Sequence, residues 1–164
     1  MDNYAIYRLP GKEECICLSS CSQPVTLDSV SDLNGRRGFV IAPFVPSPES
    51  PLLLLVPDHT EILKMGDLEG VLDFSHTEAC RPAKSHQLFS EWESYQRMFK
   101  EFHQHLSSDE FQKIVLARRS RRYEESVPAP GILFQKACQR YPHLFVALVS
   151  TPQSGTWLTA TPEI

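Results

Sequence analysis

The chain has 164 residues, of which 41% are hydrophobic and 22% charged, and its formal net charge is −4. These values are typical of a soluble globular protein, and the length fits one domain or part of a larger one. The negative net charge provides no field that would attract nucleic acid or an anionic membrane. No apolar run reaches the roughly 18 residues that suggest a membrane-spanning helix, so we expect neither partner.

The N-terminal residues carry no basic segment followed by an apolar stretch, so no secretory signal is predicted. The five cysteines form an odd set without a CxxC pair: Cys15, Cys17, Cys21, Cys80 and Cys138. The first three suggest a metal site by their spacing, but no second cluster with zinc-like spacing follows. We therefore expect reduced thiols, a cytoplasmic protein and no metal site within this chain.

The first part of the chain, residues 1–84, is predicted to be a variable, β-rich segment. Short apolar runs bounded by proline and glycine are typical of strands. Residues 58–84 are mixed and polar, and they are predicted to form a loop or short irregular pieces. The expected strands are 4–9, 15–18, 38–43 and 51–56.

Residues 85–106 give the clearest helical pattern. Apolar residues recur at spacings of three and four, which places them on one stripe of a helix. We expect this stripe to pack in a core. Its members are Leu88, Trp92, Tyr95, Phe99, Phe102 and Leu106.

Residues 85–164 are predicted to contain the first portion of a second domain. After the helix we expect a strand at 111–118, a helix at 128–141, and strands at 144–149 and 156–161 joined by a turn. The fold class is α/β in the broad sense (α+β), with antiparallel sheets flanked by helices. Because the sequence stops inside a strand pattern, we expect the front part of a longer domain or a truncated product.

Lys113 lies in the apolar middle of the predicted strand 111–118. One interpretation is a lysine near a strand end that extends its ammonium into water. The other is a buried lysine whose neutral form acts as a general base. Glu163 is similarly open: it shares a strand face with Thr159 and Thr161, and it is either solvated or a catalytic acid.

Two segments together resemble the chorismate-utilising enzymes, most closely the isochorismate synthases. Residues 111–118, FQKIVLAR, are similar to that family's KhVLAR strand, and residues 157–163, WLTATPE, are similar to its (F/W)LGATPE segment. Lys113 and Glu163 are fifty residues apart, which fits the family. The specific resemblance covers roughly residues 85–164, and the preceding residues match more loosely.

The resemblance implies a partial chorismate-binding fold of the anthranilate synthase component I type. It implies that Lys113 takes a proton from the water that attacks C2 of chorismate, and that Glu163 protonates the departing C4 hydroxyl. Ala160 and Thr161 are implied to contact the substrate. Mg²⁺ would hold the substrate carboxylate, with its ligands in a C-terminal half that this chain lacks. We therefore expect the chain to be inactive alone.

Two alternatives to isochorismate synthase stay open within this resemblance: a salicylate synthase and a truncated, non-catalytic module. Relatives that use ammonia generally lack the lysine, so Lys113 favours water as nucleophile, but salicylate synthases share it. A truncated, non-catalytic interaction module is a further alternative. Thr159 stands where the family usually has glycine. Whether the product would feed menaquinone or siderophore biosynthesis is also open, as is the oligomeric state.

Overall fold

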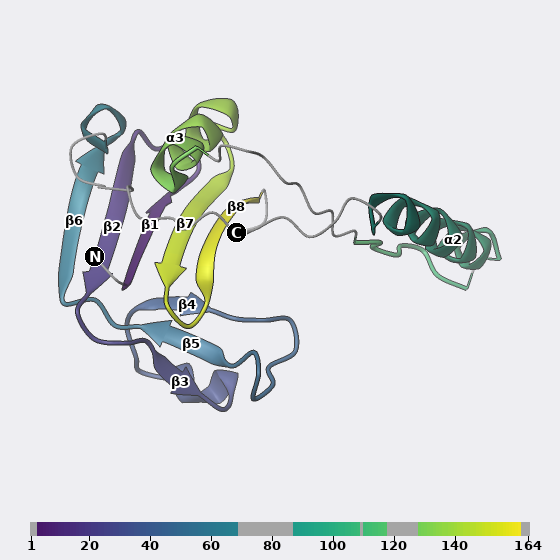
Figure 1. Cartoon of the computed structure of the whole chain (residues 1–164), viewed down its shortest axis with the longest axis horizontal. Helices are drawn as coiled ribbons and strands as arrows, with labels where there is room; N and C mark the ends of the chain where they lie inside the picture. The colour runs from purple at the N-terminus through teal and green to yellow at the C-terminus, as the bar shows by residue number, and fades with distance from the viewer. Residues whose placement is uncertain (1–2, 69–86, 109, 118–127, 162–164) are drawn as a thin grey trace. The chain divides into compact units, whose positions relative to one another are not determined.

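The computed structural model describes residues 3–68, 87–108, 110–117 and 128–161. They belong to two compact units, each described separately below. The larger unit comprises Met1–Thr77 and Pro128–Ile164, and the smaller comprises Glu78–Val127. Figure 1 shows both, with the strands in the larger unit and the long helix α2 in the smaller.

The larger unit contains a five-stranded antiparallel sheet in the order β6-β2-β1-β7-β8 (Figure 1). The central strand β1 pairs with β2 on one side and with β7 on the other, so that Ala5 lies opposite both Leu18 and Val149. The start and the end of the described sequence therefore share one sheet. Its strands are β1 (Asn3–Arg8), β2 (Glu14–Ser20), β6 (His59–Lys64), β7 (Phe145–Thr151) and β8 (Gly155–Thr161).

A three-stranded antiparallel sheet in the order β3-β5-β4 covers one face of the larger sheet. Its strands are β3 (Val25–Leu27), β4 (Phe39–Ile41) and β5 (Leu52–Leu55). All four β5 residues are buried, because Leu55 packs toward Ala5 while Leu52 and Leu54 pack on the other side near the short helix η1 (Val30–Leu33). This continuous apolar run is typical of a strand covered on both faces.

Gly38 marks a close approach at the start of β4. Its φ of 155° lies in the region that favours glycine. A Cβ at this position would lie 2.3 Å from the backbone oxygen of Leu55, well inside contact distance. A side chain there would separate β4 from β5.

Helix α3 (Pro130–Arg140) covers the opposite face of the five-stranded sheet. Proline in its first turn suits a position where no backbone donor is needed. Phe134 and Cys138, one helical turn apart, are 0% and 4% exposed and form a core with residues from β1, β2 and β7. The predicted helix at 128–141 is thus confirmed.

Strands β7 and β8 form the hairpin that the sequence predicts. Thr151 pairs with Gly155, whose φ of 71° provides the left-handed turn residue. The Thr151 hydroxyl also accepts a hydrogen bond from the Ser154 backbone N–H at 2.9 Å. A three-residue loop closed by glycine is one of the common hairpin connections.

The prediction of a loop over residues 58–84 is wrong at its beginning. Residues 59–64 form β6, which pairs with β2 from Glu14–Lys64 to Ser19–His59. Only Leu63 of this strand is buried. Since an edge strand of this kind has little to bury, its sequence lacks the alternation that marks a strand, and its backbone pairing alone defines it.

In the smaller unit, α2 (Gln87–Ser107) confirms the predicted helix. The apolar stripe does not form a core among the described residues: Trp92 is 49% and Phe99 52% exposed. The aromatic rings stack along the helix surface instead, with ring centroids 5.7 Å apart for Trp92 and Tyr95 and 6.5 Å for Tyr95 and Phe99. The apolar periodicity correctly predicts the helix. Burial of the apolar stripe requires in addition another element packed against it.

The predicted strand at 111–118 is not formed over its described residues, 111–117, which lie in no helix or strand. The sequence has the apolar residues of a buried strand. A strand exists, however, only where a neighbour satisfies its backbone groups, and no described strand pairs with this segment.

The antiparallel α+β architecture is confirmed, with a different grouping of segments. We predicted a division between residues 1–84 and 85–164, whereas β7, β8 and α3 join the strands of the first part in one unit. Pairing of β1 with β7 causes this, and sequence order does not reveal such a contact. No helix in the described part of the chain is long and apolar enough to cross a membrane.

We expect Phe134→Ala to lower the free energy of unfolding by about 3–5 kcal/mol, because it leaves a cavity between α3 and the sheet. Ile132→Ala on the same helix is the control, since Ile132 is 47% exposed. Urea titration followed by circular dichroism measures both. Equal effects of the two substitutions would contradict the packing described for α3.

Asp58 makes a pH-dependent contribution to the stability of the larger unit. Its carboxylate accepts hydrogen bonds of 2.8 Å from the Cys21 backbone N–H and from the Ser20 hydroxyl, and these lower the pKa of Asp58 below 3.8. The stabilisation is therefore present above the unfolded-state pKa and is lost as the pH falls through the folded-state pKa. We expect Asp58→Ala to lower the Tm at pH 7, and the difference from wild type to shrink below about pH 4. The exposed Asp28→Ala should show neither effect.

Candidate functional site

The residues of the two family-like segments lie in different units. Lys113 belongs to the smaller unit and is exposed. Ala160 and Thr161 belong to β8 in the larger unit, and Glu163 lies outside the described residues. Of the described residues, Lys113 thus lies in the smaller unit, and Ala160 and Thr161 lie together in the larger unit.

Ala160 and Thr161 face opposite sides of the five-stranded sheet. Ala160 pairs with Val146, which belongs to the core beneath α3. Thr161 pairs with Phe145 on the face toward the three-stranded sheet. Because side chains alternate along a strand, these two neighbours cannot line the same side of a site with their side chains.

The face that carries Thr161 contains a cavity of about 620 Å³, which we call the β8 cavity. β7 and β8 form one wall, and residues 39–43 and 49–51 form another. From β8 it is lined by Trp157 and Thr159. Thr159, which stands where the resembled family usually has glycine, therefore lines the β8 cavity.

The lining of the β8 cavity is mainly apolar. Among its described lining residues, Glu49 is the one charged group, and the polar ones are Ser50, Gln153, Ser154 and Thr159. Such a lining suits an uncharged, partly apolar group. A dicarboxylate would find a carboxylate there and no described cationic partner for its own charges.

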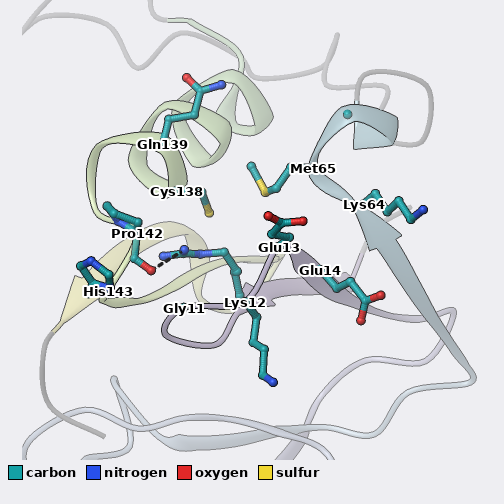
Figure 2. Close-up of a pocket in the computed structure, with 12 residues that line it drawn as sticks. Gly11, Lys12, Glu13, Glu14, Lys64, Met65, Cys138, Gln139, Pro142 and His143 are labelled. Carbon is teal, nitrogen blue, oxygen red and sulfur yellow. Dashed lines mark hydrogen bonds between the residues drawn. The ribbon is translucent and has the colours of Figure 1, made fainter.

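A second hollow, of about 880 Å³, lies at the other face of the sheet, where β1, β2 and α3 meet, and we call it the Arg8 hollow. It carries charges of both signs. Figure 2 shows Lys12 directed away from Cys138, with Met65 and Glu13 on the side where Cys138 lies. Its lining residues are Arg8, Gly11, Lys12, Glu13, Glu14, Lys64, Met65, Gly66, Cys138, Gln139, Pro142 and His143.

Arg8 is a buried cation, 4% exposed, at the end of β1. Its terminal nitrogens donate to the backbone oxygens of Pro142 at 2.7 Å, Tyr141 at 2.6 Å and Leu144 at 2.8 Å. Figure 2 shows the bond to Pro142. The guanidinium thereby holds the loop between α3 and β7, and its Nε has no hydrogen-bond partner among the described residues.

Two buried thiols lie beside this cation. Cys15 of β2 and Cys138 of α3 belong to the same buried core, and the Cys15 S–H donates a hydrogen bond of 3.2 Å to the Met65 sulfur. The interaction with Cys15 lowers the pKa of Cys138, and the charge of Arg8 lowers it further against the effect of burial. The interaction with Cys138 and burial raise the pKa of Cys15. The two thiols thus have pKa values shifted in opposite directions.

The Mg²⁺ ion implied by the family resemblance has no fitting ligand set here. Magnesium prefers carboxylate and water oxygens in an octahedral arrangement. Among the described residues, no three His, Cys, Asp or Glu side chains come together in a way that could hold a metal ion.

Sequence reasoning did not single out the Arg8 hollow. Arg8 ends a predicted strand and there resembles an ordinary surface cation. The sequence did carry one signal, because Cys15 and Cys17 are two apart on a strand and so share a face, which becomes the face beneath α3. The partner Cys138 lies more than one hundred residues later, beyond the reach of local patterns.

We expect Arg8→Met to destabilise the protein by about 1.5–3 kcal/mol or more, because hydrogen bonds from a charged donor are lost and buried carbonyl groups are left unpaired. Arg36→Met, at an exposed arginine, is the control. Urea titration measures both. An unchanged midpoint for Arg8→Met would contradict its role in holding the loop after α3.

Comparison with known proteins adds no relative. No protein-family model, no curated protein and no solved structure matches this chain. The fold and the candidate sites therefore stand on the residues and contacts described above.

Proposed function

We propose that this chain carries the acid and the base of an isochorismate synthase, which converts chorismate to isochorismate. The observation that supports this is the occurrence of two family-like segments, FQKIVLAR and WLTATPE, with Lys113 and Glu163 fifty residues apart. Either segment alone would be weak support. The antiparallel α+β architecture is compatible with the proposal without being specific to it.

The proposed roles follow from the chemistry of the reaction. Water is a poor nucleophile, so Lys113 accepts a proton as the water oxygen bonds to C2. Hydroxide is a poor leaving group, so Glu163 donates a proton as the C4–O bond breaks and water departs. One water is consumed and one is released, and the ring double bonds shift between these positions. Each proton transfer is typically worth about 10²–10⁴-fold in rate.

This role places one demand on Lys113 and another on the residues that would bind the substrate. The ammonium has to release its proton before it can accept one from water, which loss of solvent contact favours. Lys113 is exposed in the smaller unit, so bound substrate itself has to provide part of that desolvation. The substrate carboxylates also need partners, and the described lining of the β8 cavity, with Glu49 as its charged residue, is unsuited to them.

Incubation with chorismate and MgCl₂, followed by HPLC of the products, tests the proposal. If a longer protein contains this chain, that protein should form isochorismate, and the 164-residue chain alone should form none. Lys113→Ala and Glu163→Gln should each lower kcat by about 10²–10⁴-fold. Lys100→Ala and Glu101→Gln are matched controls on the exposed surface of α2 and should retain activity.

Three results would count against the proposal. Salicylate as the accumulating product would indicate the related synthase that also eliminates pyruvate. Unchanged kcat in Lys113→Ala would remove the lysine from the mechanism. An absence of turnover in such a longer protein would favour a non-catalytic interaction module.

A further inference from the structure

The β8 cavity lies between the two sheets of the larger unit, and the proposed reaction does not use it. Alternate residues of β7, namely Phe145, Ala147 and Val149, form one of its walls. Four steps along a strand span roughly 13 Å, so the cavity is elongated along β7. Its volume of about 620 Å³ lies within the roughly 300–1,000 Å³ that is typical of sites for small molecules.

Aromatic rings in fixed positions form part of this lining. Trp157 is 64% exposed, yet its indole Nε1–H donates a hydrogen bond of 2.6 Å to the Ser154 backbone oxygen. Phe39 and Phe145 each pack against Tyr7, with ring centroids 6.0 Å apart in both pairs. A ring that is already held loses little conformational freedom when a ligand packs on it. These rings therefore provide a prearranged surface for an apolar group.

The charge at the cavity comes from Glu49. This residue lies in a turn that two reciprocal backbone hydrogen bonds of 3.0 Å close between Ser47 and Ser50. The exposed Glu49 side chain lines the cavity, and no Lys, Arg or His accompanies it among the described lining residues. A cation is attracted both by a carboxylate and by the negative faces of aromatic rings, whereas an anion is repelled by both.

We propose that the β8 cavity binds a small organic cation with an apolar body, of the arylalkylamine class. The apolar body packs on the aromatic and aliphatic lining, and the ammonium group lies toward Glu49. Such a ligand suits the mainly apolar lining because only one end of it is charged. This inference is independent of the proposed function, since it uses neither Lys113 nor Glu163.

Three compounds with the same phenylethyl body and different end groups test the proposal. Phenethylamine is a cation at pH 7, phenethyl alcohol is neutral and hydrocinnamate is an anion. Isothermal titration calorimetry on the whole chain measures the Kd of each. We expect phenethylamine to bind at least about 3-fold more tightly than the alcohol, and hydrocinnamate to bind most weakly. Phenylalanine, which adds a carboxylate to phenethylamine, should bind more weakly than the amine.

Glu49→Gln tests the source of the preference for a cation. It should lower the affinity for phenethylamine by about 2–5-fold, as expected for an exposed ion pair, and leave the affinity for phenethyl alcohol unchanged. Glu13→Gln is the matched control, because Glu13 is also exposed but lines the Arg8 hollow. A loss of amine binding in Glu13→Gln and not in Glu49→Gln would place the amine at the Arg8 hollow and contradict the proposal.

Trp157 reports where the ligand binds. The chain has two tryptophans, so Trp92→Phe leaves Trp157 as the remaining indole. Phenethylamine should change the fluorescence of this variant with the same Kd as in calorimetry. Trp157→Ala should weaken both phenethylamine and phenethyl alcohol by about 3–10-fold, because both lose an aromatic contact. Phe44→Ala should weaken neither, since Phe44 is fully exposed and does not line the cavity.

Three results would overturn the proposal. The first is hydrocinnamate or phenylalanine binding as tightly as phenethylamine. The second is an unchanged ratio of the amine and alcohol affinities in Glu49→Gln, with circular dichroism confirming the fold. The third is an absence of phenethylamine binding to the wild type at millimolar concentration.

Discussion

Antiparallel pairing of β1 on both of its edges is the contact on which the larger unit depends. One edge binds β2, the next strand in sequence, and the other binds β7, from the far end of the chain. Because α3 and the three-stranded sheet then cover opposite faces, Ala5 and Ile6 are both fully buried although their side chains point in opposite directions. Only a strand that is apolar on both faces can occupy this position.

The end of β1 explains why chemically similar cysteines differ. Arg8 continues the strand into the layer beneath α3, where its charge is held against three carbonyl groups. Cys17, two residues from Cys15 on the same face, has its pKa raised by burial and by the nearby Glu61. Cys138, next to Arg8, has its pKa lowered. The interaction with Cys15 and then the charge of Arg8 lower the pKa of Cys138, whereas burial dominates for Cys17.

The proposed catalytic residues depend on a different kind of contact. In the proposed reaction a base and an acid act on one small ring, so both have to face the same substrate. Among the described strands of the larger unit, β8 is the last in the sheet order and pairs with β7. Thr159 and Thr161 face the side of the sheet that carries the β8 cavity, and Ala160 faces the side covered by α3.

The sequence by itself determined the elements with a clear apolar pattern: β1, β2, β4, β5, β7, β8, α2 and α3, together with the β7–β8 turn. It also carried the two motif segments on which the proposed function rests. The tertiary structure decided whatever depends on a distant partner. β6 is a strand because β2 pairs with it, residues 111–117 lie in no helix or strand, and Trp92 and Phe99 of the α2 stripe are about half exposed. The burial of Arg8, Cys15 and Cys138 in one layer arises in the same way, since local patterns report how a residue relates to its neighbours along the chain and not which remote residue it meets.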